Sequence, residues 1–139
     1  MNRMFWSFLV IIVFSHSSIA QSISSLKWKN RILILMDSKG NHSIRNKQLS
    51  TFNELEEEIR DRDLVILCYD GNSLLNRDLK PTTYKITNKI DLDFQGVILI
   101  GKDGGIKLKR PFLVKPKIIF ETIDSMPMRK EEMRKSGNN

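Results

Sequence analysis

The chain has 139 residues, a formal net charge of +7 and a single cysteine. This length argues for one domain, and one thiol excludes an internal disulfide framework. The basic residues are scattered rather than clustered, so their surplus fits solubility better than a dedicated polyanion surface, although it can favour anionic partners.

The first 20 residues have the three parts of a secretory signal peptide. Arg3 supplies a positive charge, residues 5–14 are almost unbroken apolar sequence, and Ser18 and Ala20 are small residues at positions −3 and −1 of the cleavage site. The apolar run is about half the length of a membrane span. We therefore predict a signal peptide over 1–20 and a secreted or periplasmic mature chain, with no membrane span after signal cleavage and no nucleic-acid partner.

The mature chain opens with a lead-in over 21–30. Leu26 and Trp28 are alternating apolar positions in this polar segment, and we expect Trp28 to pack on the domain. The run 31–36, RILILM, is short, continuous and apolar, which predicts a strand buried on both faces. The composition of 37–43 predicts a loop.

Residues 44–60 change to a helical period, and 63–69 return to a continuous apolar run. Thr51 and Glu54 have the spacing of a capping box. A strand, a helix and a strand in this order predict a right-handed parallel βαβ unit. The apolar positions that give the helix one buried face are Leu49, Phe52, Leu55 and Ile59.

A loop over 70–83 and a short, irregular helix over 84–92 are predicted next. Two β-rich runs, 96–101 and 105–110, then flank an Asp-Gly-Gly sequence, which predicts a β-hairpin. Apolar and basic residues alternate in the second run, which predicts a buried face and an edge strand protected by lysines. The alternating residues are Ile106, Lys107, Leu108 and Lys109.

Two prolines define the C-terminal helices. Pro116 is placed for the first turn of a helix that ends near Ser125, because the residue before Pro127 is pushed away from the helical region. Pro127 then opens a second helix over 127–135, and we expect a disordered tail over 136–139.

The predicted domain over 31–135 has the element order β-α-β-(α)-β-β-α. A parallel βαβ half followed by an antiparallel ββα half, in a mixed sheet flanked by helices, is the thioredoxin-like arrangement of the α/β class. Thiol exchange requires a low-pKa thiolate near a helix N-terminus, usually with a second cysteine. The single cysteine, Cys68, lies instead inside a predicted buried strand, so no redox pair is present.

Other chemistries find little support. His42 is the only histidine after the predicted leader, so a histidine-based metal site is not available, and we expect no metal and no cofactor. The sequence GKDGG, 101–105, lacks the spacing of a phosphate-binding P-loop. Asn41 begins a formal glycosylation sequon, whose use depends on the host.

The corner before Pro127 leaves two interpretations open. Asp124 ends one helix, where an anion is disfavoured, but it also precedes the next helix, where an anion is favoured. A contact with Arg129 across the bend would make Asp124 a structural brace. Alternatively, Met126, Met128 and Arg129 form an exposed contact patch, since flexible thioethers suit adaptable binding surfaces.

Four segments together resemble one known family. The segments LKWKNRILIL, RDLVIL, LIGKDGGIKLK and IDSMPMRKEEM, which span about residues 26–133, are similar to the DUF4174 family of exported, thioredoxin-like domains. Related domains occur in animal extracellular-matrix and sushi-repeat proteins. The resemblance implies the fold and the exported location, and it implies no catalytic residue because the family defines none.

We therefore expect a non-enzymatic binding or structural module for an anionic polysaccharide or a protein partner. The alternative is an enzyme, either a divergent oxidoreductase that uses Cys68 or a hydrolase that uses Asp103 or Asp124. The candidate ligand-binding residues are Lys102, Asp103, Lys107, Lys109, Asp124, Met126, Met128 and Arg129.

Overall fold

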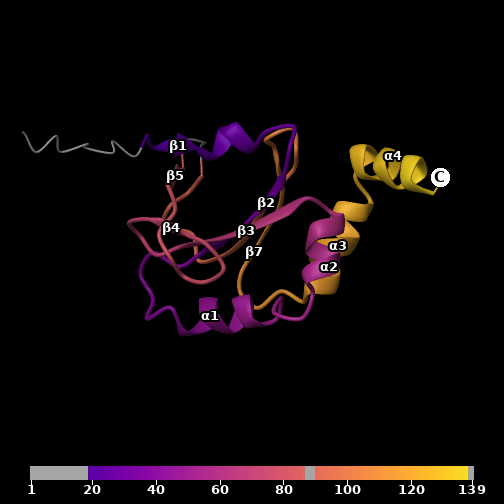
Figure 1. Cartoon of the computed structure of the whole chain (residues 1–139). Coiled ribbons are helices and arrows are strands. Elements are labelled where there is room, and N and C mark those ends of the chain that lie inside the picture. Colours follow the sequence, from indigo (N-terminus) through magenta and orange to yellow (C-terminus); the bar gives the residue numbers. More distant parts are fainter. Residues whose placement is uncertain (1–18, 87–89, 138–139) are drawn as a thin grey trace, which may run out of the picture.

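The computed structural model describes residues 19–86 and 90–137 and has an α/β architecture (Figure 1). The predicted leader up to residue 18 and the end of the predicted tail, 138–139, lie outside the described residues. The elements in chain order are β1 (Gln21–Ser22), the 3-10 helix η1 (Ile23–Leu26), β2 (Arg31–Met36), α1 (Ser43–Ser50), α2 (Glu56–Asp61), β3 (Leu64–Tyr69), β4 (Leu74–Leu75), β5 (Tyr84–Lys85), β6 (Gly96–Ile100), β7 (Ile106–Arg110), α3 (Pro116–Asp124) and α4 (Pro127–Ser136).

Five strands form one mixed sheet in the order β4-β3-β2-β6-β7. β2 and β3 are parallel, with Arg31 opposite Leu64 and Met36 opposite Tyr69. β6 is antiparallel to β2, and β7 is antiparallel to β6. The predicted parallel half and antiparallel half of the sheet are therefore confirmed. β1 and β5 form a separate parallel sheet of two strands.

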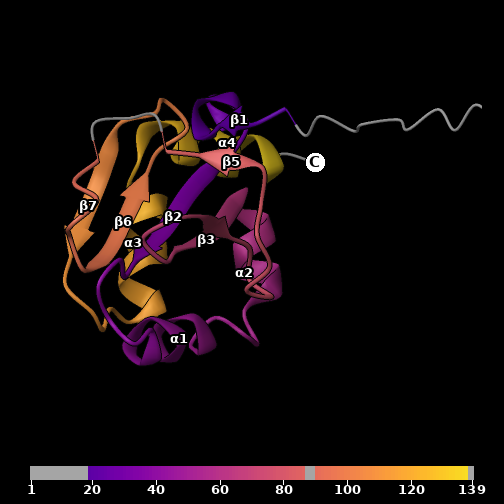
Figure 2. The same cartoon turned by 90° about the vertical axis from the view of Figure 1, so that its left-hand side faces the viewer.

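Both faces of the mixed sheet are covered. On one face, the leucines of β2 pack against α1, α2 and α3. On the other face, the isoleucines of β2 and β6 pack against η1 and the connector 74–94. Figures 1 and 2 accordingly show α1 on the opposite side of the sheet from β1 and β5. Burial on both faces explains why the central strands read as continuous apolar runs.

The helix predicted over 44–60 is divided into α1 and α2. Residues 51–54 form a turn between the two helices. The Thr51 hydroxyl donates to the Gln48 carbonyl at 2.6 Å, and such local bonds compete with the backbone bonds of a continuing helix. Thr51 therefore ends α1, α2 begins without a side-chain cap, and the capping-box interpretation with Glu54 is wrong.

The segment between β3 and β6 differs from the sequence-based prediction. The helix predicted over 84–92 is not formed in its described part, because Tyr84–Lys85 is strand β5, which pairs with β1; residues 87–89 lie outside the described residues. The predicted loop 70–83 contains β4, which pairs with β3 at the sheet edge. Pairing with distant segments overrides the local apolar pattern here. In residues 19–86 and 90–137, no helix is sufficiently long and apolar to cross a membrane.

The predicted hairpin forms, but its outer strand is less buried than expected. β7 is the edge strand of the sheet, as predicted. Leu99 pairs with Leu108 while Ile100 pairs with Ile106, which leaves Lys107 as the extra residue of a bulge. A bulge re-aims the neighbouring side chains, and Ile106 is 47% exposed, so its predicted burial is wrong.

Candidate binding pocket

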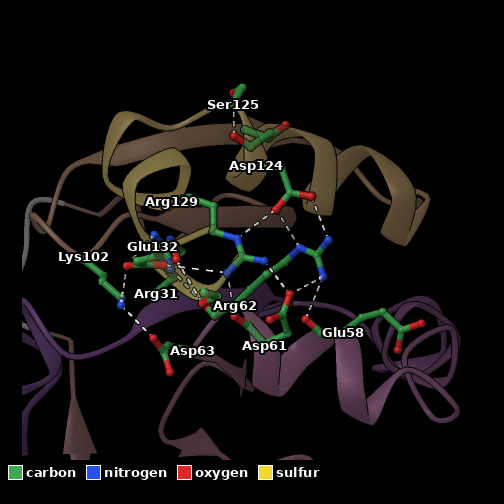
Figure 3. A network of polar contacts seen from close by, with 12 residues as sticks. Arg31, Glu58, Asp61, Arg62, Asp63, Lys102, Asp124, Ser125, Arg129 and Glu132 are labelled. Carbon is green, nitrogen blue, oxygen red and sulfur yellow. Dashed lines mark hydrogen bonds and ion pairs between the residues drawn. The ribbon is translucent and has the colours of Figure 1, made fainter. Parts of the chain in front are cut away.

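A carboxylate holds the corner between α3 and α4. Asp124 accepts hydrogen bonds from Arg62 at 3.0 and 2.7 Å and from Arg129 at 3.1 Å (Figure 3). Arg129 is only 5% exposed and also donates to the backbone carbonyl and the carboxylate of Asp61. The predicted Asp124–Arg129 contact is confirmed, whereas Arg129 does not belong to an exposed patch. Arg62 completes the brace and was not expected from the sequence.

Glu132 fastens α4 to the amino end of β2. Its carboxylate accepts hydrogen bonds from both terminal nitrogens of Arg31, at 3.1 and 3.2 Å, and from Lys102 at 2.7 Å. Lys102 also donates to Asp63 at 2.7 Å. Arg31 and Lys102 are both buried cations. Because a buried charge without a partner is costly, these two cations depend on the carboxylates around them.

We call this group the ion-pair network: Arg31, Arg62, Lys102 and Arg129 with Asp61, Asp63, Asp124 and Glu132. Burial opposes ionisation of Asp124 and Glu132, but hydrogen bonds from Arg62, Arg129, Lys102 and Arg31 outweigh it and lower the pKa of both carboxyls. A catalytic acid needs a raised pKa. Asp124 and Glu132 therefore stay ionised and act as fixed negative charges opposite the cations, rather than as proton donors.

The four sequence segments that resemble a known family meet in this network. Arg31 comes from the first segment, Arg62 from the second and Lys102 from the third, while Asp124 and Arg129 come from the fourth. These segments are far apart in the chain and are joined by charged side chains (Figure 3). These four segments thus build a structural junction between α4, the end of α2 and the sheet.

A pocket of about 580 Å³ lies beside the network, between the β6–β7 turn and the α3–α4 corner. This volume is within the range of ligand pockets in proteins. Trp28 from the lead-in forms a third wall. The other lining residues are Arg31, Gly101, Lys102, Asp103, Lys107, Thr122, Ser125, Met126, Pro127 and Met128.

Trp28 is displayed at this pocket rather than packed in the core. Its side chain is 62% exposed, so the predicted packing of Trp28 on the domain is wrong. Its φ of 67° lies in the left-handed region, which non-glycine residues adopt at a cost. The Trp28 amide donates to the Lys102 carbonyl at 2.6 Å, which joins the lead-in to the residue that the network holds. The Lys27 ammonium lies 5.2 Å from the centre of the Trp28 ring.

The pocket gathers most of the predicted ligand-binding residues. Lys102, Asp103, Lys107, Met126 and Met128 line it together. The remaining three do not. Asp124 and Arg129 belong to the ion-pair network, and Lys109 lies 3.7 Å from the Asp91 carboxylate and 4.5 Å from the centre of the Phe94 ring. Trp28 was missed as a pocket residue because its apolar character indicated a core position.

The cations inside the pocket are already neutralised. Lys102 is bound by two carboxylates, and Lys107 donates to Asp103 at 2.8 Å. Hydrogen bonds from Lys107 and from the Gly105 amide lower the pKa of Asp103, so this carboxyl is ionised as well. Three exposed lysines on the segments around the pocket pair with no carboxylate among the described residues: Lys27, Lys29 and Lys130.

Cys68 is not placed for thiol chemistry. Its side chain is fully buried in β3, and burial raises the pKa of the thiol to about 11, against a smaller opposing effect of the Arg45 charge. The thiol is therefore protonated at neutral pH and is a poor nucleophile. Among the described residues, no group of three or more His, Cys, Asp or Glu side chains is arranged to hold a metal ion.

Comparison with known proteins gives one match. No curated protein and no solved structure matches the chain. A family model described as a domain of unknown function, DUF4174, matches residues 22–132, which include the ion-pair network and the pocket. The chain therefore belongs to the DUF4174 family.

Proposed function

We propose that this protein is exported and acts as a non-enzymatic binding module with a thioredoxin-like fold. The leader pattern over 1–20 supports export. The strand order β3-β2-β6-β7, a parallel pair next to an antiparallel hairpin, supports the fold assignment. The single cysteine leaves the chain without a redox pair, so binding is favoured over electron transfer.

The main support for the proposal is that Trp28 is exposed beside a preformed pocket. An exposed tryptophan held by a strained backbone next to two methionines, Met126 and Met128, is an apolar contact surface with a defined shape. Tryptophan is among the residues that contribute most to protein interfaces. The surrounding lysines and the net charge of +7 favour an acidic partner.

The ligand that fits this chemistry is an acidic peptide segment of a partner protein with one bulky apolar side chain. The apolar side chain would enter the pocket between Trp28 and Met128, and acidic residues beside it would meet the exposed lysines. An anionic polysaccharide fits less well, because Lys102 and Lys107 are already bound to carboxylates of this chain.

Trp28 itself provides the test. The sequence contains two tryptophans, and the other one, Trp6, lies in the predicted leader, so Trp28 is the only tryptophan of the mature chain. Peptides selected from a displayed library of acidic sequences with one aromatic or aliphatic residue should shift Trp28 fluorescence to shorter wavelength in a saturable way. A heparin-like polysaccharide is titrated in parallel as the competing ligand class.

Met128 and Met133 form a matched pair of variants. Both are exposed methionines of α4, but only Met128 lines the pocket. We expect Met128→Ala to weaken peptide binding about tenfold or more, as for an interface anchor, and Met133→Ala to leave it unchanged. Equal effects of the two substitutions, or saturation by the polysaccharide but by no peptide, would contradict a peptide-binding pocket.

Export is tested separately on the full chain expressed in a bacterial host. The expected result is a protein in the periplasmic fraction or the medium whose first residue is Gln21. Recovery of uncleaved protein from the cytoplasm would contradict export while leaving the pocket proposal intact.

A further inference from the structure

A second polar cluster lies at the opposite end of the sheet from the ion-pair network, where β2 and β3 end and α1 begins. Five buried side-chain nitrogen or oxygen atoms have no hydrogen-bond partner among the described residues, and four of them are in this cluster. The four atoms are Oδ2 of Asp37, Oγ of Ser38, Nδ1 of His42 and Nη1 of Arg45. Buried polar atoms are normally paired, so such a concentration requires an explanation.

Arg45 is the member of the cluster whose burial is most costly. It is 3% exposed, and its Nε and Nη2 atoms donate only to the neutral Asn46 side chain, at 3.2 and 2.9 Å. In the part of the chain that the structure describes, Arg45 forms no salt bridge. A guanidinium is always charged, and a buried charge is costly unless an opposite charge meets it.

Asp70 is near enough for the Arg45 charge to help lower its pKa, but among the described residues no carboxylate accepts a hydrogen bond from Arg45. Asp37 Oδ1 accepts from the Gly40 amide at 2.8 Å, and its Oδ2 lies 3.5 Å from Nδ1 of His42. Asp70 accepts hydrogen bonds from the amides of Asn72 and Ser73, at 2.9 and 2.7 Å. Both carboxylates therefore serve to close their own loops, and Nη1 of Arg45 remains without an acceptor.

The position of the cluster is one where open α/β sheets bind ligands, namely beyond the carboxyl ends of the parallel strands. Arg45 lies in the first turn of α1, and its charge acts on Cys68 and Asp70 at the carboxyl end of β3. A side chain at Gly71 would lie within 2.7 Å of the Ser38 backbone, so the loops after β2 and β3 are in close contact. The N-terminus of α1 adds a partial positive charge at the same place.

We propose that this end of the sheet is a binding site for a small oxyanion, a carboxylate or a phosphate group, with the Arg45 guanidinium and the Ser38 hydroxyl as its donors. The anion supplies the acceptor that Nη1 of Arg45 lacks. Ser38 and His42 are only partly buried, so their loop is in part accessible to solvent, although the Ser38 Oγ atom is itself covered. The Asp37–His42 contact shapes the loop and is not a ligand contact.

The experiment uses the mature chain with inorganic phosphate and, separately, acetate as probes. Thermal unfolding midpoints are measured at rising probe concentration, with ionic strength held constant by sodium chloride. Binding to the native state raises the midpoint by mass action. We expect a rise for the wild type and for Lys47→Met, which removes an exposed cation from the same helix, and no rise for Arg45→Met. A rise with only one probe identifies the anion class.

A second variant covers the case in which Arg45→Met does not fold. Ser38→Ala removes one donor hydroxyl and should weaken phosphate binding several-fold in an NMR titration that follows backbone amides. The wild-type shifts should fall in 38–46 and not in the pocket turn 101–107. No midpoint change relative to sodium chloride, an equal rise in Arg45→Met, unchanged binding in Ser38→Ala, or shifts confined to 101–107 would each overturn the proposal.

Discussion

At the scale of single residues, Asp124 illustrates how one carboxylate can hold a helix corner. It is hydrogen-bonded to both Arg62 and Arg129, and Arg129 also pairs with Asp61. Replacing Asp124 by Asn keeps the shape but removes the charge. We expect Asp124→Asn to lower the free energy of unfolding by about 1–3 kcal/mol at pH 7, measured by urea denaturation followed by circular dichroism.

Asp91→Asn is the control for Asp124→Asn. Asp91 is an exposed residue whose contact with Lys109 is 3.7 Å long, so its loss should change stability by no more than about 0.5 kcal/mol. A loss of stability in Asp124→Asn with unchanged peptide binding would assign Asp124 to the brace. Stability equal to that of the Asp91 variant would contradict a structural role.

Cys68 gives a second prediction at this scale. With a thiol pKa of about 11, only about one molecule in a thousand carries the thiolate at pH 8. We therefore expect iodoacetamide to alkylate Cys68 at least about 100-fold more slowly in the native protein than in guanidinium chloride. Mass spectrometry of timed samples measures both rates. Fast alkylation of the native protein would restore the oxidoreductase alternative.

At the scale of elements, a buried amide side chain joins α1 to the segment before α3. Gln48 is fully buried, its Nε2 donates to the Val114 carbonyl at 2.7 Å, and its Oε1 accepts from the Val114 amide at 2.6 Å. Gln48→Leu would leave both backbone groups buried and unpaired. We expect a loss of about 2–4 kcal/mol in unfolding free energy and faster hydrogen exchange of the Val114 amide.

Lys47→Ala is the neighbouring control, because Lys47 is exposed on the same helix. It should change stability by less than about 0.5 kcal/mol and leave the exchange of Val114 unchanged. If Gln48→Leu were as stable as this control, the hydrogen bonds between α1 and the segment before α3 would contribute nothing to the free energy of unfolding.

The strands β2, β3, β6 and β7 and the proline corner could be predicted from local sequence because their causes are local. Continuous apolar runs specify β2 and β3, Asp-Gly-Gly specifies the hairpin, and proline geometry separates α3 from α4. The segment 84–92 was assigned wrongly because its strand depends on pairing with β1. The division of 44–60 depends on hydroxyl groups that compete for backbone carbonyls, which apolar periodicity does not report.

At the scale of the whole molecule, the site could be predicted only in part. Lys102, Asp103, Lys107, Met126 and Met128 were named as candidate ligand-binding residues, and the structure places these five around one pocket. The carboxylates that bind Lys102 were not named, since Asp63 and Glu132 are 39 and 30 residues away from it in the chain. The display of Trp28 depends on its positive φ, which no local pattern indicates for a tryptophan.

Four carboxyl groups, two of them in the ion-pair network, predict how the stability of the whole molecule depends on pH. The pKa values of Asp70, Asp103, Asp124 and Glu132 are all lowered in the folded chain. Their contribution is therefore fully present above the unfolded pKa, about 4, and is lost as the pH falls through the folded values. Asp124→Asn should make this loss at acid pH smaller.

At alkaline pH, stability is lost as the pH rises rather than as it falls, and the cause is Cys68 instead of the carboxyl groups. The pKa of Cys68 is raised from 9.0 to about 11, so its contribution is present below pH 9 and is lost as the pH rises toward 11. A shift of this size corresponds to about 2–3 kcal/mol. Urea denaturation from pH 3 to pH 11 should show a plateau near neutral pH with losses on both sides. Cys68→Ala lowers the plateau, because it opens a cavity, but it should flatten the alkaline loss; a parallel decline in both proteins above pH 9 would show that Cys68 does not cause it.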